Sequence, residues 1–452
     1  MKFDTKSVGP QAQGWIERDT ACISPSLSRE YPLVVGHAEG SELWDVDGRR
    51  YIDFMAGIAV LNVGHRHPYV LEKVREQVDK FWHICLSDFY YPQAVELAEK
   101  LQAIAPMDDT LVYFGNSGTE AVEAAIKLAM YKTGRQKFIG FLGAFHGRTL
   151  GSLSVTASKT AQRANYATGI KTFHVPYPNA YRPILKADPF DNCGDAVVDY
   201  IEEQLFSTML SPYDVAGILV EPIQGEGGYI VPPPGFFPRL RELADKYGIL
   251  LMTDEIQSGA GRTGKWWAIE HEGVEPDIVC FAKGVGSGMP IGGIIARKEL
   301  MSWGPGTHGS TYGGNPVAAS SALATLEVIE QENVLQQAHD TGEYIMDALV
   351  EMQDRHPSIG DLRGRGLMIG VEFVKDRATK KRAIELRNEI IQQAFKRGLL
   401  LIPCGTNAIR MTPPLNIPRP LVEEGLAIFE SVLTEVEGKM LARNGVMAGI
   451  GA

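Results

Sequence analysis

The sequence lacks the cysteine pairs and the long apolar runs that would mark a secreted or membrane-bound protein. Its five cysteines are scattered over 452 residues with no C-x-x-C spacing, which argues against a disulfide framework or a zinc site. No stretch approaches the roughly 20 apolar residues that a membrane-spanning helix needs, and residues 1–6 contain no apolar signal core. We therefore expect a cytoplasmic protein that does not bind membranes.

The sequence also lacks an excess of positive charge. Lysine and arginine number 44 against 55 aspartates and glutamates, which gives a formal net charge of −11. A globally basic surface for nucleic acid is thereby excluded, although local basic pockets are compatible with this balance. With 44% hydrophobic and 22% charged residues, the composition is that of a globular protein of one large and one or two smaller domains. Small-molecule chemistry fits these properties best.

The pattern of apolar residues divides the chain into three parts. Residues 1–65 combine short strand signals with turns and predict an amino-terminal arm and part of a small domain. Residues 66–320 alternate apolar strands with amphipathic helices, which predicts a large α/β domain whose sheet is covered on both faces. A long helix, 316–333, leads into residues 321–452, whose charged helices and short strands predict a carboxy-terminal small domain.

Two polar side chains follow apolar strands inside the large domain. Lys283 comes after the apolar run 278–282, and Asp254 follows the predicted strand 249–253. The carboxyl ends of parallel strands meet at one edge of a sheet, so we expect both side chains in one crevice, with Glu255 facing away. Burial would lower the pKa of Lys283 and make its amine a nucleophile for a carbonyl cofactor, while a carboxylate can keep a pyridine nitrogen protonated. A lysine alone would more simply be an exposed strand end.

A turn at residues 116–120 predicts a phosphate site. It lies between a strand, 112–114, and an amphipathic helix, 121–132. Free N–H groups at a helix amino terminus bind phosphate, the hydroxyls of Ser117 and Thr119 add hydrogen bonds, and Gly118 permits close backbone approach. Ser117 with Glu120 fits a plain capping box equally well, so the turn alone leaves both interpretations open.

A second glycine-rich segment, 259–264, matches the dinucleotide pattern G-x-G-x-x-G and raises the alternative of a nucleotide-binding oxidoreductase. Its context argues against this, because Trp266 replaces the hydroxyl residue of a P-loop and only a short helix follows. The histidines and acidic residues of 65–67 and 270–272 lack the spacing that sets two metal ligands on one helix face, so we expect no metal.

Taken together, Lys283, Asp254 and the 117–119 turn resemble fold-type I pyridoxal-phosphate enzymes, and the remaining motifs resemble the class III aminotransferases. The resemblance covers nearly the whole chain and is carried by six segments in order: 115–121, 145–149, 221–228, 254–259, 309–316 and 410–415. It implies an α/β fold with a large mixed, mostly parallel seven-stranded sheet domain. A smaller α/β domain would be formed by the amino- and carboxy-terminal segments.

The resemblance also implies pyridoxal 5'-phosphate as cofactor and assigns residues to it. Lys283 would bond the cofactor covalently and then move the proton between substrate carbon and cofactor. Asp254 would pair with the pyridine nitrogen, Gln257 would hydrogen-bond the ring hydroxyl, and Phe145 would stack on the ring. The further cofactor-binding positions implied are Ser117, Gly118, Thr119, His146, Glu221 and, contributed to the neighbouring subunit of a homodimer, Thr311.

For the substrate, the family resemblance implies an ion pair between two side chains that breaks when a substrate carboxylate binds. Glu226 would pair with Arg410 until an α-carboxylate arrives, since an arginine fork binds carboxylates bidentately. Arg148 would hold the distal carboxylate of 4-aminobutyrate or 2-oxoglutarate, and Ile58 lies in a segment, 57–62, that resembles the 4-aminobutyrate group. Without the family context, each arginine could equally form a structural salt bridge.

These features predict an aminotransferase that moves an amino group from an ω-amino acid or amine to a 2-oxo acid, such as 2-oxoglutarate or pyruvate, by a ping-pong mechanism. Residues 176–182 also resemble an archaeal branch that contains broad-range aminotransferases and amino-acid racemases, so a racemase is the first alternative. A catalytically silent protein of this fold is a further one. We expect a homodimer, or a tetramer built from dimers, with shared active sites.

Overall fold

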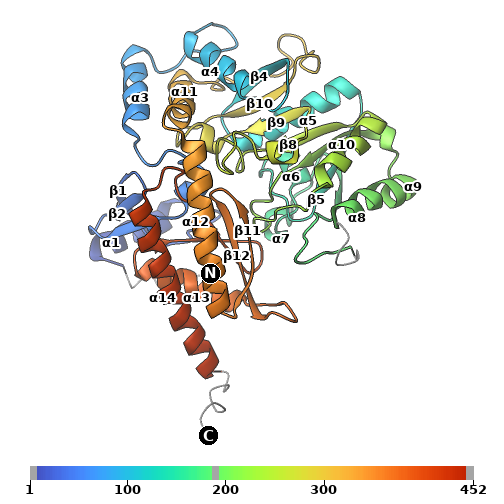
Figure 1. Cartoon of the computed structure of the whole chain (residues 1–452). Coiled ribbons are helices and arrows are strands. Elements are labelled where there is room, and N and C mark those ends of the chain that lie inside the picture. The colour runs from blue at the N-terminus through green and yellow to red at the C-terminus, as the bar shows by residue number, and fades with distance from the viewer. Residues whose placement is uncertain (1–7, 186–192, 444–452) are drawn as a thin grey trace.

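The computed structural model describes residues 8–185 and 193–443, so the amino-terminal residues 1–6 lie outside the described part of the chain. A seven-stranded sheet dominates the upper part of Figure 1. Its strands are, in spatial order, β4 (Thr110–Gly115), β10 (Gly292–Arg297), β9 (Ile278–Phe281), β8 (Leu250–Asp254), β7 (Val215–Val220), β5 (Lys137–Phe141) and β6 (Lys171–Val175). Only β10 runs antiparallel to its neighbours, which confirms the mixed, mostly parallel sheet.

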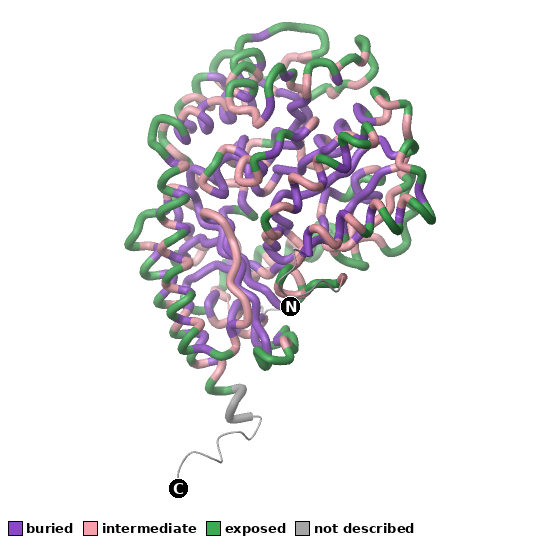
Figure 2. The backbone as a smooth tube through the Cα atoms, turned by 45° about the vertical axis from the view of Figure 1, so that its right-hand side comes forward, coloured by how far each residue is buried: buried purple, intermediate pink, exposed green. Residues whose placement is uncertain are grey.

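Helices bury both faces of this sheet, which explains its continuous apolar strands. Alternate residues of β9 belong to different cores: Ile278 and Cys280 pack with the alanine-rich helix α5 (Gly118–Thr133), and Val279 and Phe281 pack into the opposite core. The second face is covered by helices that include α4 (Pro92–Ala103), α8 (Cys193–Asp199), α10 (Phe236–Tyr247) and α11 (Pro316–Gln331). Figure 2 shows buried backbone running through the strands.

The described parts of the amino- and carboxy-terminal segments fold together below the large sheet (Figure 1). A hairpin of β2 (Glu42–Asp45) and β3 (Arg50–Asp53) pairs with β1 (Val35–Glu39), and β3 pairs in parallel with the distant strand β14 (Leu399–Leu400). A third sheet contains β11 (Ile359–Arg365), β12 (Met368–Asp376), β13 (Lys381–Arg382), β15 (Ile402–Cys404) and β16 (Ala408–Met411). This confirms a smaller α/β part built from both terminal segments.

The remaining helices complete this arrangement. The carboxy-terminal helices α12 (Val334–Arg355), α13 (Ile384–Lys396) and α14 (Arg419–Arg443) pack in the smaller part. The other helices are α1 (Pro10–Cys22), α2 (Ala56–Ala59), α3 (Pro68–Lys80), α6 (Leu150–Val155), α7 (Thr160–Arg163), a π-helical turn (Tyr200–Leu205), α9 (Phe206–Thr208), and 3₁₀ turns at Pro212–Asp214, Ala268–Glu272 and Lys283–Val285. In the described ranges, every helix is too short or too polar to cross a bilayer.

Several predicted boundaries differ from the observed ones: β4 and α5 extend one to three residues beyond the predicted ranges 112–114 and 121–132, and two other differences have local reasons. The strand expected at 249–253 lies one residue later, because the N–H of Ile249 donates to the carbonyl of Ala244 and closes the end of α10. The helix expected at 316–333 ends at Gln331, because Asn333 takes a left-handed conformation that stops one helix before the next begins. The first of these shifts makes Asp254 the last residue of β8.

Candidate active site

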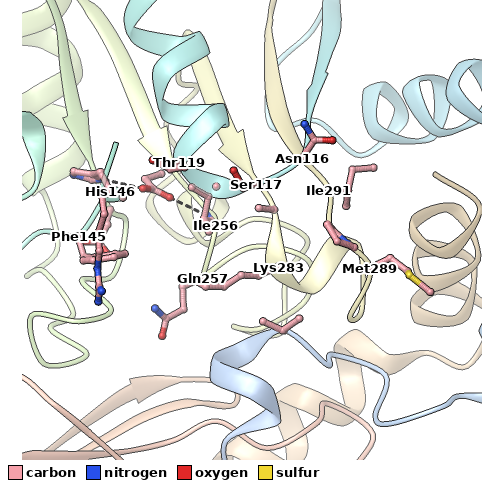
Figure 3. Close-up of a pocket in the computed structure, with 18 of the residues that line it drawn as sticks. Asn116, Ser117, Thr119, Phe145, His146, Ile256, Gln257, Lys283, Met289 and Ile291 are labelled. Atoms are coloured by element: carbon pink, nitrogen blue, oxygen red, sulfur yellow. Dashed lines mark hydrogen bonds and ion pairs between the residues drawn. The ribbon is translucent and has the colours of Figure 1, made fainter. Parts of the chain in front are cut away.

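Lys283 lies just beyond β9, where the backbone turns sharply away from the sheet. Its φ of 40° is rare for a residue with a side chain, and strain of this kind is characteristic of functional sites. The side chain is half-buried and lines a cavity of about 450 Å³ (Figure 3). Burial lowers the pKa of the Lys283 amine, and the negative charge of Asp254 opposes that shift. The predicted crevice at the carboxyl edge of the sheet is therefore present.

Asp254 lines the same cavity and is held by two contacts. One carboxylate oxygen lies 2.7 Å from Nδ1 of His146, and the other accepts the backbone N–H of Ile256 at 3.0 Å. The His146 imidazole, which also lines the cavity, is fully buried. These contacts fix the direction of the Asp254 carboxylate.

Glu255 points away from Asp254, as the alternation of side chains along a strand predicts. Its carboxylate accepts hydrogen bonds from the hydroxyl of Ser258 and from the N–H groups of Ala268 and Ile269. Burial raises the pKa of Glu255 to about 7. Asp254 is therefore the carboxylate of this pair that faces the cavity.

The 116–120 turn caps the following helix and also lines the cavity, while its binding of phosphate stays a prediction. Ser117 caps α5: its hydroxyl oxygen accepts the N–H of Glu120 at 3.4 Å, and its hydroxyl donates to the Glu120 carboxylate at 2.8 Å. The Glu120 carboxylate accepts the N–H of Asn116 rather than that of Ser117, so only half of a capping box forms. The same turn lines the cavity with Ser117, Gly118 and Thr119. A side chain added at Gly118 would come within 2.9 Å of the Ile256 side chain, which would then have to shift. The first N–H groups of a helix are free to bind an anion, and here they lie beside Lys283.

Phe145 and His146 line the opposite side of the cavity from Met289 and Ile291 (Figure 3). Arg148 also lines it; this side chain is exposed, with its guanidinium 5.7 Å from the centre of the Phe145 ring. An exposed cation at a cavity rim is placed to meet an anionic group entering from solvent.

Glu221 supports the loop that carries Phe145. Its carboxylate accepts the N–H groups of Phe145, at 3.2 Å, and Gly225, at 3.0 Å. Burial raises the pKa of Glu221 to about 7, and the nearby charge of Asp254 adds to this. Glu221 thus lines the cavity and also joins two of its loops.

Gln257 connects the cavity to the predicted arginine pair. Its side-chain oxygen accepts the hydroxyl of Tyr229 at 2.7 Å and Nη1 of Arg410 at 3.2 Å. Arg410 is buried, and its Nη2 lies 3.1 Å from the Glu226 carboxylate. The structure therefore brings Glu226 and Arg410 into the predicted contact, one residue away from the cavity wall.

Besides Glu226 and Arg410, two further predicted site residues do not line this cavity within a single chain. Thr311 lies in an exposed loop, and Ile58 is exposed in a left-handed backbone conformation with φ of 70°. Their assignments to cofactor and substrate remain predictions, that of Thr311 requiring a second subunit.

Several cavity-lining residues were not among the predicted site residues. Three of them belong to the segments that carry the family resemblance, and the others carry no motif: Asn116, Gly147 and Ile256, and then Val60, Ala282, Gly288, Met289, Pro290 and Ile291. The glycines between Lys283 and Met289 were the available signal, because they permit a tight return of the chain.

The glycine-rich segment 259–264 has a structural role that excludes the dinucleotide alternative. Arg262 is fully buried and donates to Asn62 Oδ1, at 2.7 Å, and to the carbonyls of Pro413 and Leu367. Only a 3₁₀ turn, Ala268–Glu272, follows, so there is no helix amino terminus to hold a pyrophosphate.

Comparison with known proteins gives consistent matches along the chain. A model of class-III aminotransferases matches residues 23–433. An alanine/serine racemase of Pyrococcus horikoshii is 41% identical, covering 96% of this chain and 93% of that protein. A 5-aminovalerate aminotransferase of Pseudomonas aeruginosa is 40% identical, covering 93% and 98%. A solved (S)-enantioselective ω-transaminase of Thermomicrobium roseum has a TM-score of 0.86 at 31% identity, covering 94% and 98%.

The cavity has the chemical groups that pyridoxal phosphate, the cofactor of these enzymes, requires. Lys283 offers an amine of lowered pKa, Asp254 a fixed carboxylate, and the start of α5 a helix amino terminus for the phosphate. All three open onto one space of about 450 Å³. The chain therefore belongs to the class-III aminotransferases, a family of pyridoxal-phosphate-dependent enzymes.

Proposed function

We propose that the enzyme transfers the amino group of an ω-amino acid or amine, of the 4-aminobutyrate or 5-aminovalerate kind, to a 2-oxo acid by a ping-pong mechanism. The observation that carries this proposal is the buried Arg410, paired with Glu226 and joined through Gln257 to the cavity of Lys283. While Glu226 neutralises Arg410, the pocket accepts a carbon without a carboxylate. Once Arg410 is released, the same pocket binds a 2-oxo acid.

Each polar group of the cavity has a role in this proposal. Pyridoxal phosphate, when bound, supplies an electron sink for the carbon that loses its proton. The Lys283 amine anchors the cofactor and then carries the proton, a task for which its position matters as much as its pKa. Asp254, held by His146, pairs with the ring nitrogen, and the Ser117–Thr119 turn holds the phosphate. Arg148 at the rim receives the distal carboxylate.

The test is a panel of amino donors offered with 2-oxoglutarate or pyruvate. We expect ω-amino acids such as 4-aminobutyrate and 5-aminovalerate to form glutamate or alanine faster than α-amino acids do. The proposal fails if no ω-amino donor yields either product while α-amino acids react.

A second candidate function is amino-acid racemisation. It is supported by the racemase at 41% identity and by the resemblance of residues 176–182 to a branch that contains amino-acid racemases. The same lysine would return the proton to the opposite face of the substrate carbon. Incubation with one enantiomer and no 2-oxo acid separates the two functions, since only a racemase would give continuous inversion.

We further propose a cytoplasmic homodimer, alone or paired into a tetramer, in which Thr311 reaches the cofactor phosphate of the neighbouring subunit. The exposed position of Thr311 is compatible with this. We also retain the boundaries near residues 65 and 320 as proposed domain limits. Sedimentation of the holoenzyme tests the assembly, and weaker cofactor retention in Thr311→Ala tests the shared site; a monomer with full activity would reject both.

A further inference from the structure

The carboxylate of Glu226 contacts two cations rather than one. Its Oε2 lies 3.1 Å from Nη2 of the buried Arg410, and its Oε1 forms an ion pair with Nζ of Lys159. Arg410 is 4% exposed and Lys159 is 51% exposed, while Glu226 lies between them at 16%. Glu226 therefore bridges an inner and an outer cation at the boundary between the pocket and the solvent.

The backbone around Glu226 is fixed on both sides. The carbonyl of Glu226 accepts the N–H of Gly405 at 2.8 Å, and the N–H of Gly225 donates to Glu221. The carbonyl of Gly228 accepts two hydrogen bonds from Arg363, at 3.0 and 2.7 Å. Because the loop is held in this way, the carboxylate can leave Arg410 by rotation of the Glu226 side chain without movement of the main chain.

The outer cation changes the cost of that rotation. A largely buried carboxylate that loses its only partner keeps its desolvation penalty without any compensating attraction. Lys159 is already in contact with Glu226 while the pair with Arg410 is intact. When a substrate carboxylate takes Arg410, Glu226 consequently retains a charged partner.

We propose that Lys159 determines specificity as a positioning residue: it holds Glu226 whenever the α-carboxylate of a 2-oxo acid or amino acid occupies Arg410. The inference rests on the Glu226–Arg410 exchange of the proposed function and names the group that makes this exchange reversible. Removal of Lys159 strengthens the closed pair with Arg410. It thereby disfavours carboxylate-bearing substrates and leaves carboxylate-free amines unaffected.

The experiment compares Lys159→Met and Lys159→Arg holoenzymes with the wild type. The inhibition constant for glutarate, an unreactive dicarboxylate, and the KM for 2-oxoglutarate are measured beside the KM for a primary monoamine. For Lys159→Met we expect both dicarboxylate constants to rise about two- to fivefold, the range of a partly exposed ion pair, with the monoamine constant unchanged. Lys159→Arg should restore the wild-type values. An equal change for the monoamine would overturn the proposal.

Two controls separate this role from a general effect of charge. Lys171→Met removes another exposed lysine, whose ammonium lies over the ring of Phe173, and should leave the glutarate constant unchanged. Lys159→Met introduced into Glu226→Gln should add no further change. An effect of Lys171→Met, or a full effect of Lys159 without Glu226, would overturn the proposal.

The exchange itself is tested separately. If Arg410→Ala weakens 2-oxoglutarate selectively but Lys159→Met does not, only the role of Lys159 is rejected. If Arg410→Ala raises the KM for the monoamine as much as the KM for 2-oxoglutarate, the proposed exchange between Glu226 and Arg410 is itself rejected.

Discussion

At the scale of single residues, the polar side chains of the site differ in whether they line the cavity or lie behind its wall. Lys283 opens onto the cavity from a strained backbone, and Asp254 is fixed by His146. Arg410 is buried behind Gln257 and reaches the cavity only through its hydrogen bonds. In the proposed function, the amine that anchors the cofactor and the guanidinium that recognises carboxylates are thus separate groups, and we expect substrate preference to change independently of the reaction chemistry.

Arg410→Ala tests this separation. We expect the KM for 2-oxoglutarate to rise at least about tenfold, because charged hydrogen bonds to the α-carboxylate are lost. The KM for a primary monoamine should stay within about twofold, since such a donor makes no use of the arginine fork. Steady-state kinetics with both substrates measure the two effects, and comparable losses for both would contradict the assignment.

The sequence allowed most of these side chains to be predicted, because each follows a strand or belongs to a motif. Lys283 and Asp254 were placed by strand ends, and Glu255 was correctly turned away by alternation. Lys159 was not predicted, because an exposed lysine 67 positions from Glu226 carries no local signal. Contacts of this kind form only when distant segments pack together in the folded protein. No spacing of residues along the sequence indicates them.

At the scale of elements, the end of β8 carries two adjacent carboxylates in opposite surroundings. Asp254 faces the cavity, whereas Glu255 is enclosed by the 3₁₀ turn that follows, accepting N–H groups from its first residues. Burial raises the pKa of Glu255 to about 7. The folded protein therefore binds this proton more tightly than the unfolded chain does.

A pH dependence of stability follows from that shift. The contribution of Glu255 is fully present below its unfolded pKa of about 4.5 and is lost as the pH rises through about 7. Glu255→Gln should remove this part of the fall in thermal midpoint between pH 5 and pH 8, at the cost of one accepted hydrogen bond. Glu242→Gln, an exposed change on α10, is the matched control and should leave the slope unaltered. An unchanged slope in Glu255→Gln would contradict the argument.

The elements themselves were largely predictable, since long periodic segments define them. The strand expected at 249–253, for example, lies within one residue of β8 at each boundary. The parallel pairing of β3 with β14 was not expected in detail, because nearly 350 positions separate the two strands. Pairing over such a distance is decided by the assembled core, where Ile52 and Leu399 are both buried.

At the scale of the whole molecule, one buried side chain joins three distant parts of the chain. Arg262, in the loop after β8, binds Asn62 of the amino-terminal segment and the carbonyls of Leu367 and Pro413 of the carboxy-terminal segment. The Leu367 N–H donates back to the Arg262 carbonyl. Burial lowers the pKa of Arg262 to about 10, which still leaves it charged at neutral pH. Arg262 thereby fixes the position of the loop after β8 relative to the amino- and carboxy-terminal segments.

Arg262→Met should consequently destabilise the folded enzyme by roughly 3 kcal/mol, because buried acceptors are left without donors. The exposed substitution Arg75→Met on α3 should cost less than about 0.5 kcal/mol. Thermal or urea unfolding of the two holoenzymes provides the comparison. Equal stabilities would show that Arg262 does not join the parts.

The most direct test of the account is a single half-reaction without a 2-oxo acid. Holoenzyme mixed with 5-aminovalerate or 4-aminobutyrate should lose the visible absorbance of its lysine-bound cofactor and release one equivalent of aldehyde product per site. Added 2-oxoglutarate should restore the absorbance and form glutamate, and Lys283→Ala should do neither. Unchanged absorbance with these donors, together with steady inversion of a single amino-acid enantiomer, would contradict the account.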